Sequence, residues 1–536
     1  MSALPCVLFG ALLPVLPALL TPLGSSAQDA PLTAAEATGG ARTTTLAEAQ
    51  AFLDGLQGLP SSDRVAVGTA GSSGEGRPLI LAAVGGMQPT LDAAEARARG
   101  GLRILVVANI HGGEVEGKEA VLRLLRETAE GQHGARWEDC QAWFLPIYNA
   151  DGNERIARTN RVSQNGPDGG VGERANAAGL DLNRDFVKAE APETRALLEV
   201  LNAFDPHLLL DLHTTDGSYH GYHLTYATSL SSNTDPRLDR FARERVLVPA
   251  REQLRALHGF RTFDYGNLTR GEPARWATYD HRPRFGTNMV GLRNRVAVLS
   301  EAYSYLDFPE RIEVTHAFVL GVVDAARAAA PELLGLTARL DRELEEGRPA
   351  LFGDQTRLCD PRPHALLLGE VDEVSLEGLG VRRVARPVWR QELVGLQDRF
   401  VAGRRRVLPA AWLLPSPSEA DRALLQLHGV RFQELGEAAL GACRGFRLEA
   451  IQRAERPFQG HHEVRLSGAW VEVAAPPASP SALLVPSRQP LARVAAQLLE
   501  PESEDSLYTW NHFDERLTVG ELAPVLRVET WPGDQR

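Results

Sequence analysis

The chain has 536 residues, of which 43% are hydrophobic, so it is long enough for more than one globular domain. Its formal net charge of −12 argues against nucleic acid as the main partner. Beyond an N-terminal leader only Cys140, Cys359 and Cys443 remain. At most one disulfide can form among them, which excludes a fold built on disulfides.

The first 27 residues have the pattern of a secretory signal peptide. An apolar stretch from Leu4 to Leu20 is followed by Ser25-Ser26-Ala27, which places small residues before a cut at Gln28. The alternative is a membrane anchor, but three prolines in the segment disfavour a spanning helix. We therefore expect a secreted or periplasmic protein with a signal peptide at residues 1–27 and no membrane span after cleavage.

Strand and helix patterns alternate from Leu46 to about residue 330. A helix at Leu46–Leu56 and a hairpin over residues 65–84 come first. Nearly continuous apolar runs, typical of strands buried on both faces, then predict strands at Arg103–Ile110, Gln141–Ile147, His207–Leu212 and Val296–Ser300. Helical patterns separate them at Gly117–Thr128, Ala191–Phe204, Pro236–Leu257 and Pro309–Ala330. This alternation predicts an α/β fold in which helices cover both faces of one sheet.

The sequence changes character after residue 330. A charged helix, Leu336 to Glu346, is expected to connect two parts of the chain. Short strand patterns then occur among proline-rich turns, at Gly380–Arg386, Arg444–Glu449 and His462–Leu466. We expect a first domain at residues 40–330 and a C-terminal, mainly β or α/β, accessory region at residues 350–536.

His111-Gly-Gly-Glu114 lies between a predicted strand and a predicted helix. Such a turn lies at the carboxyl edge of a sheet, where open α/β folds bind ligands. An imidazole and a carboxylate at this spacing can bind one Zn²⁺, and a catalytic zinc needs a third protein ligand. His213 ends the predicted strand His207–Leu212 and fits that role. His220 and His223 are rival ligands that lie beyond the next turn.

Three further groups suit hydrolysis of a peptide-like bond. Glu301 follows the strand Val296–Ser300 and is a candidate general base. Asn183 and Arg184 offer an amide and a planar guanidinium side by side, which suits capture of a carboxylate. Arg174 precedes them and is a candidate to stabilise an oxyanion.

The order of these motifs resembles the zinc metallocarboxypeptidases of the carboxypeptidase A type, peptidase family M14. The resemblance covers roughly residues 40–330, and its motifs in chain order are His-Gly-Gly-Glu114, Asn-Ala-Asp-Gly152, Gly-Leu-Asp-Leu-Asn-Arg-Asp-Phe186, Asp-Leu-His213 and Leu-Ser-Glu301. It implies an α/β/α sandwich with a mixed eight-stranded sheet. It also implies one zinc ion per chain, held by His111, Glu114 and His213.

The resemblance assigns expected roles to the remaining residues. Glu301 would be the general base, and Asn183 with Arg184 would hold the terminal carboxylate of the substrate. Arg174 would be the oxyanion arginine, with Arg158 and Arg161 in the same loop as alternatives. Tyr279 could play the part of the mobile, substrate-binding tyrosine of the digestive members.

The expected function is that of a secreted zinc metallocarboxypeptidase that removes C-terminal residues with zinc-activated water and a glutamate base. Its partner would be a peptide or peptide-like substrate with a free C-terminal carboxylate. The alternatives are a zinc amidohydrolase of N-acyl amino acids or cell-wall peptides, and a non-catalytic protein that binds peptide C-termini. Arg282 and Arg284 add the hypothesis of an acidic substrate group. A second metal at His461-His462 is disfavoured, since no carboxylate spacing accompanies the pair.

Overall fold

A computed structural model of the chain describes residues 30–86, 88–269, 271–435, 440–473 and 481–530. The predicted signal peptide at residues 1–27 lies outside these residues. Within them, no helix combines the length and apolar character needed to span a bilayer. Cys140, Cys359 and Cys443 are all free thiols, so the described part of the chain contains no disulfide.

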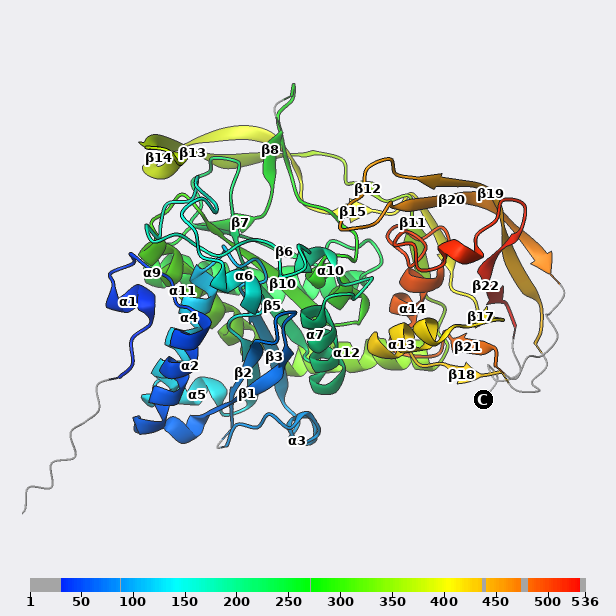
Figure 1. Cartoon of the computed structure of the whole chain (residues 1–536), viewed down its shortest axis with the longest axis horizontal. Coiled ribbons are helices and arrows are strands. Elements are labelled where there is room, and N and C mark those ends of the chain that lie inside the picture. Colours follow the sequence, from blue (N-terminus) through cyan, green and yellow to red (C-terminus); the bar gives the residue numbers. More distant parts are fainter. Residues whose placement is uncertain (1–29, 87, 270, 436–439, 474–480, 531–536) are drawn as a thin grey trace, which may run out of the picture.

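One mixed eight-stranded sheet forms the centre of the first domain (Figure 1). Its spatial order is β1 (Val65–Ser72), β2 (Pro78–Gly85), β4 (Cys140–Leu145), β3 (Leu102–Ala108), β5 (Leu208–Thr215), β10 (Val296–Tyr303), β6 (Leu224–Thr228) and β7 (Thr262–Asp264). The four inner strands β4, β3, β5 and β10 run parallel, whereas β1, β2 and β6 join by antiparallel pairing. The expected α/β fold with a mixed eight-stranded sheet is therefore confirmed.

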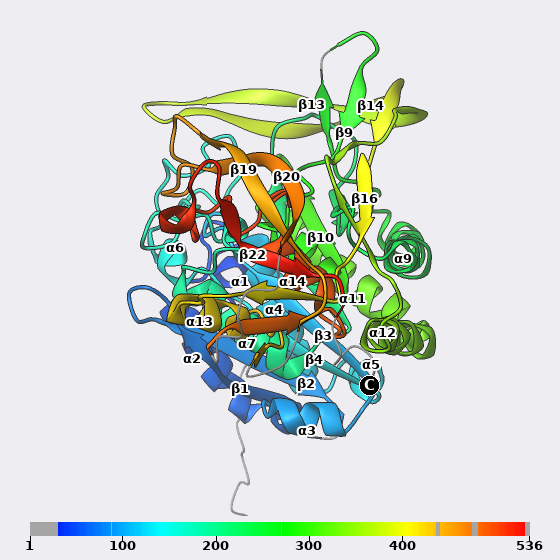
Figure 2. The same ribbon diagram turned by 90° about the vertical axis from the view of Figure 1, so that its right-hand side faces the viewer.

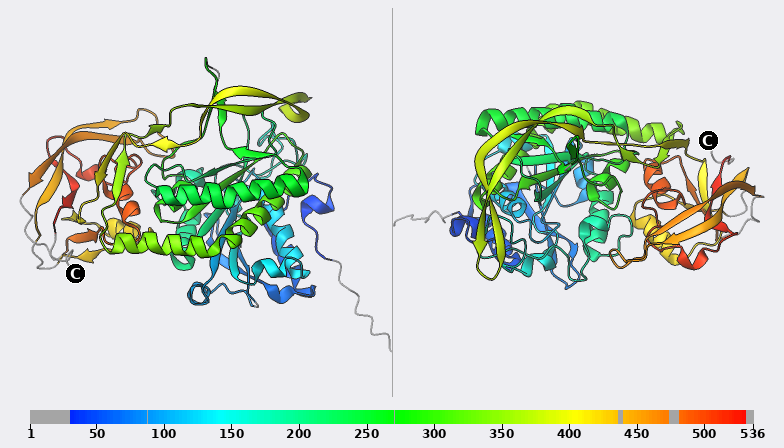
Figure 3. Two further views of the ribbon diagram at one scale, coloured as in Figure 1. Left: turned by 180° about the vertical axis from the view of Figure 1, so that it is seen from behind. Right: turned by 90° about the horizontal axis from the view of Figure 1, so that it is seen from above.

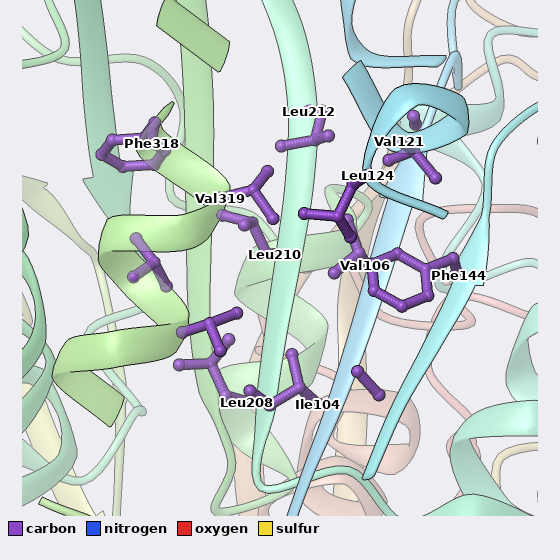
Figure 4. Packing of buried hydrophobic residues seen from close by; sticks show 14 of the residues in the cluster. Ile104, Val106, Val121, Leu124, Phe144, Leu208, Leu210, Leu212, Phe318 and Val319 are labelled. Carbon is purple, nitrogen blue, oxygen red and sulfur yellow. The ribbon is translucent and has the colours of Figure 1, made fainter. Parts of the chain in front are cut away.

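Helices cover both faces of this sheet. One face packs against α2 (Leu46–Gly55), α4 (Glu116–Ala129), α9 (Val248–His258) and α11 (Phe308–Ala328). Figure 4 shows side chains of β3 and β5 meeting those of α4 and α11 on this face. The other face packs against α7 (Pro192–Phe204) and α10 (Gly286–Leu292). Alternate residues of a strand point to opposite faces, which explains why the apolar runs of β3 and β5 are almost unbroken.

The helix predicted over Pro236–Leu257 is interrupted. α8 (Pro236–Phe241) leads into a π-helical turn at Ala242–Leu247, and α9 follows. Pro249 explains the break, because a proline within a helix has no N–H to donate to the carbonyl four residues earlier. Each hydrogen bond of this π-helical turn spans one residue more than in an α-helix.

A long helix and a long hairpin extend from the first domain. α12 (Ala330–Glu345) runs along it toward the C-terminal region (Figure 3). β13 (Arg362–Leu376) and β14 (Gly380–Gln397) then form a hairpin that pairs with β9 (Arg275–Ala277) and β8 (Asn267–Thr269). Seen from above in Figure 3, this hairpin crosses over the first domain. The backbone N–H of Ala385 binds the carbonyl of Tyr305 at 2.7 Å, which fixes the hairpin beside the end of β10.

The remaining C-terminal residues form a β-rich unit, as expected (Figure 2). Its six-stranded sheet has the order β18 (Gln433–Glu434), β21 (Leu483–Pro486), β17 (Ala411–Leu414), β22 (Leu522–Val528), β19 (Cys443–Arg453) and β20 (Val464–Val473). α13 (Glu419–Leu427) and α14 (Ala492–Leu499) pack on it. Apolar side chains of this unit share one buried cluster with α7 and α10. The domain limits at residues 330 and 350 stay a prediction, and the two parts are joined by a continuous core.

Candidate functional site

The turn after β3 is held by one asparagine. Asn109 adopts φ 60°, a left-handed conformation that asparagine tolerates better than most residues. Its side-chain amide donates to the carbonyls of His111, Gly112 and Glu114 at 3.1, 3.2 and 3.0 Å. These three bonds fold the His-x-x-Glu segment back on itself. The imidazole and the carboxylate consequently lie on the same side of the turn.

The two glycines between the metal-ligand candidates are required by close backbone packing. A Cβ on Gly112 would lie 2.4 Å from the carbonyl oxygen of Glu173, and one on Gly113 would lie 2.8 Å from that of Gly172. Any larger residue would therefore push the 172–173 segment away. The same close approach brings the next residue, Arg174, next to Glu114.

Adjacent parallel strands align the third ligand candidate with the proposed base. β5 and β10 pair so that His213 is the partner of Glu301. Asp211 precedes His213 by two residues on β5, so both side chains point to the same face of the sheet. The sheet register thus places a histidine, a glutamate and an aspartate at one edge.

His111, Glu114 and His213 come together as the sequence predicts. Nδ1 of His111 lies 3.0 Å from Oε1 of Glu114, and Nδ1 of His213 lies 3.0 Å from Oε2. All three side chains are buried, and their ligating atoms lie within 4.8 Å of one another. Burial alone would raise the pKa of Glu114, but His111 and Arg161 outweigh it and hold the pKa well below its ordinary value. The carboxylate therefore stays charged.

The outward nitrogens of both imidazoles face carboxylates. Nε2 of His111 lies 3.0 Å from Oδ1 of Asp181, and Nε2 of His213 lies 3.0 Å from Oδ2 of Asp211. Carboxylates in these positions orient metal-binding histidines and fix their tautomers. Nδ1 of each imidazole faces the Glu114 carboxylate, so the three groups are placed to share one metal ion. Two imidazoles and one carboxylate are a donor set that zinc accepts, so these residues fit a zinc ion.

The structure separates the three candidate oxyanion arginines. Arg161 donates to Glu114 at 2.9 Å, to the Thr214 carbonyl at 2.9 Å and to Gln164 at 2.8 Å, and its side chain is 16% exposed. Arg174 donates to Asp181 and keeps Nη1 3.5 Å from Glu114, with 46% of its side chain exposed. Arg158 is exposed. Arg174 alone combines proximity to the cluster with a guanidinium that faces solvent.

Glu301 lies beside this cluster on β10. Burial raises the pKa of Glu301 above its ordinary value, and the nearby His213 offsets only part of the rise. A carboxyl whose pKa is shifted toward neutrality is suited to accept and return a proton. The side chain retains partial solvent access.

Asn183 and Arg184 have fixed orientations. Oδ1 of Asn183 accepts the backbone N–H of Gly286 at 2.9 Å, which leaves the N–H groups of Nδ2 available to a ligand. Arg184 donates to the Asn183 carbonyl at 2.8 Å, and its Cζ stacks 3.9 Å from the centre of the Phe285 ring. The two side chains therefore present several N–H groups without needing to reorganise.

Tyr279 contacts Thr287, Phe285 and Tyr265. Its hydroxyl is 2.9 Å from Oγ1 of Thr287, and its ring packs against Phe285 and Tyr265. Burial raises the pKa of Tyr279, so the phenol stays protonated. A contact with substrate would require this hydroxyl to leave Thr287.

The rival histidines have other partners. Nδ1 of His220 lies 3.3 Å from the N–H of Tyr222, and Nδ1 of His223 lies 3.0 Å from that of Arg261. In the C-terminal unit, His461 faces Glu190 at 2.9 Å, whereas His462 faces the Ala454 carbonyl at 2.8 Å. Neither pair therefore joins the metal-ligand cluster.

Arg282 and Arg284, considered as contacts for an acidic substrate group, are already neutralised. Arg282 pairs with Asp280. Arg284 is buried and pairs with Asp505 at 2.7 Å and with Glu463 at 2.6 Å. These ion pairs leave little free positive charge for a substrate.

Sequence reasoning missed the carboxylates behind the ligands. Asp181 and Asp211 both lie two residues before a proposed site residue, Asn183 and His213. For Asp211 this spacing is a usable signal, since alternate residues of β5 share a face, whereas Asp181 caps a 3-10 turn and has no such signal. The pairing of Arg161 with Glu114 had no such signal, because it depends on the path of an irregular loop.

Comparison with known proteins shows what this region is similar to. The sequence profile of the family described as zinc carboxypeptidase matches residues 49–288. Mouse carboxypeptidase D is 33% identical over 153 residues, which are 24% of this chain and 11% of that protein. A probable carboxypeptidase 2 of Arthroderma benhamiae is 31% identical over 114 residues, 21% of this chain and 19% of its own length. The chain thus spans less than a fifth of each of these relatives.

Solved structures give more distant matches. A metallo-carboxypeptidase from Burkholderia cenocepacia is 18% identical with a TM-score of 0.39, over 53% of this chain and 70% of that one. Bovine thrombin-activatable fibrinolysis inhibitor is 15% identical with a TM-score of 0.39, over 55% of this chain and 98% of that one. The family profile and the motifs described above make residues 49–288 similar to the zinc carboxypeptidase family.

Proposed function

We propose that this protein is a zinc-dependent metallocarboxypeptidase that hydrolyses C-terminal peptide bonds. The observation that carries the proposal is the alignment of Glu301 with His213 on adjacent strands, beside His111 and Glu114. This alignment combines a metal-ligand set with a carboxyl suited to proton transfer. The N-terminal apolar segment further supports a secreted or periplasmic location.

The residues divide the chemistry among them. Zinc bound by His111, Glu114 and His213 would supply a Lewis acid that polarises a carbonyl and acidifies water. Glu301 takes a proton from the attacking water and later returns it to the leaving amine. Arg174 donates hydrogen bonds to the oxygen that becomes negative when water attacks.

Substrate selection follows from the two anchoring side chains. Nδ2 of Asn183 and the guanidinium of Arg184 bind the terminal carboxylate of the substrate by charge-assisted hydrogen bonds. This anchor limits cleavage to the last peptide bond. Tyr279 contributes a further substrate contact once its hydroxyl leaves Thr287.

The purified mature chain tests the proposal directly. We expect one zinc per chain by elemental analysis and stepwise loss of C-terminal residues when a mixed peptide library is followed by mass spectrometry. Intact peptides together with cleavage of N-acyl amino acids would replace the proposal with an amidohydrolase. Zinc without any hydrolysis would indicate a binding protein, and the absence of zinc would overturn the site.

Substitution of Arg184 tests the carboxylate anchor. Arg184→Ala should raise KM about 10- to 100-fold, because hydrogen bonds to charged groups contribute roughly 1.5–3 kcal/mol. We expect kcat to change much less. Peptides with an amidated C-terminus serve as the control, since they lack the charge that Arg184 binds. An unchanged KM for the free acid would show that the carboxylate is held elsewhere.

A further inference from the structure

A turn of the C-terminal unit reaches Asp181, the residue whose carboxylate lies behind His111. The turn joins β19 to β20, and Phe458 and His461 close it by two backbone hydrogen bonds of 2.8 and 3.0 Å. Gln459 and Gly460, the two residues between them, have φ of 51° and 82°. Two-residue turns with positive φ at both positions fit the twist of a hairpin. Glutamine is an uncommon residue for this conformation, so a role for its side chain is worth seeking.

The side chain of Gln459 binds the backbone of a residue behind the metal ligands. Its Oε1 accepts the N–H of Asp181 at 2.7 Å. Asp181 in turn places Oδ1 3.0 Å from Nε2 of His111 and accepts both Nε and Nη2 of Arg174 on Oδ2 at 3.1 and 2.9 Å. One aspartate therefore supports a metal ligand and the oxyanion arginine, and Gln459 fixes the backbone of that aspartate.

Contacts on both sides hold the turn against the first domain. His461 pairs at 2.9 Å with Glu190, which follows Arg184 by a few residues in the first domain. On the other side Arg284 pairs with Glu463 at 2.6 Å and with the fully buried Asp505 at 2.7 Å. Buried, hydrogen-bonded charges of this kind are costly to separate. The position of Gln459 relative to Asp181 is therefore set by the packing of the two parts of the chain.

We infer that Gln459 is a positioning residue of the active site, supplied by the C-terminal unit. It acts through Asp181 on His111 and Arg174 and touches neither metal nor substrate. This inference rests on the proposed function for its catalytic consequence. It makes the C-terminal unit a structural part of the catalytic centre.

The effect of removing this contact should be specific. Loss of residues that orient metal ligands costs about 10- to 100-fold in metal affinity or activity. We expect kcat and zinc affinity to fall by that factor. KM should change less than about threefold, because Asn183 and Arg184 are oriented separately by Gly286 and Phe285. A merely structural role would instead lower the melting temperature without this division between kcat and KM.

Two substitutions of Gln459 separate the effect of side-chain length from that of the functional group. Gln459→Asn retains the amide and tolerates positive φ well, but it is one methylene too short to reach Asp181. Gln459→Glu retains both the reach and an acceptor oxygen. Gln452→Ala, at an exposed position of β19 just before the turn, is the matched control.

The experiment uses the full-length mature protein. Zinc affinity by chelator competition, kcat, KM, melting temperature and hydrogen–deuterium exchange of the peptide around Asp181 are measured for each variant. We expect weaker zinc binding, lower kcat and faster exchange in Gln459→Asn, with recovery in Gln459→Glu and no change in Gln452→Ala.

Either of two results would overturn the inference. The first is a Gln459→Asn protein with wild-type zinc affinity and exchange. The second is an equal loss of zinc affinity and kcat in Gln459→Asn and Gln459→Glu, together with a lowered melting temperature in both. Exchange at Asp181 is read without zinc or substrate, so failure of the proposed function leaves this test intact. A wild-type protein that cleaves no peptide contradicts the proposed function alone.

Discussion

Glu301→Gln is expected to lower kcat for peptide hydrolysis by about 10²- to 10⁴-fold, the usual contribution of a positioned acid–base group. The glutamine has the same shape but cannot take a proton from water or return one to the amine. Its position on β10, in register with His213, is set by backbone pairing that the substitution leaves intact. Zinc affinity should therefore remain within a few-fold of wild type.

The control is Glu313→Gln, which changes an exposed carboxylate of α11. It alters the net charge of the protein equally and should leave kcat unchanged. Single-turnover assays at saturating peptide, together with zinc content, distinguish a defect in chemistry from a loss of metal. If Glu301→Gln turns over peptides at the wild-type rate, the proton must pass through a different group and Glu301 has no part in the mechanism.

The core of the fold follows from sequence pattern because its strands and helices are long and strongly apolar. β3, β4 and α4 lie within a few residues of their predicted limits. β6 and β7 were missed because these short strands carry no continuous apolar run. The length of β13 and β14 was also missed, since much of this hairpin is exposed and its sequence lacks a buried face.

The limits of the site strands show a more specific failure. The sequence pattern ends one strand at Leu212 and the other at Ser300, where the apolar residues stop. Hydrogen bonding continues through Thr215 on β5 and Tyr303 on β10. Polar residues at the edge of a sheet keep the backbone ladder while serving a site, so hydrophobicity underestimates these strands. The relative position of His213 and Glu301 becomes defined only by this extension.

The candidate site was predictable wherever its residues share a local pattern. His111 and Glu114 lie on one turn, and Asn183 and Arg184 are neighbours in the chain. The contact between Asp181 and Gln459 spans 278 residues and has no local signature. A tertiary contact of this kind depends on how two units pack, which a single sequence does not specify.

Removal of the metal or of one ligand should abolish hydrolysis. We expect treatment with a chelator to eliminate activity and added zinc, but not magnesium, to restore it, because imidazole ligands suit zinc and oxygen ligands suit magnesium. His213→Ala should weaken zinc binding by more than the roughly 10- to 100-fold typical of a supporting residue. The reason is that it removes one of the three proposed protein ligands and leaves Glu114 and Asp211 facing a void.

The matched control is His462→Ala, which removes an exposed histidine of the C-terminal unit. Zinc content, competition with a chelator and hydrolysis of one good peptide are measured for both variants. We expect His462→Ala to bind one zinc and to retain full activity. Retention of tight zinc and activity by His213→Ala would move the third ligand to another residue. Loss of zinc in His462→Ala would instead place the metal in the C-terminal unit, because His462 lies outside the cluster of His111, Glu114 and His213.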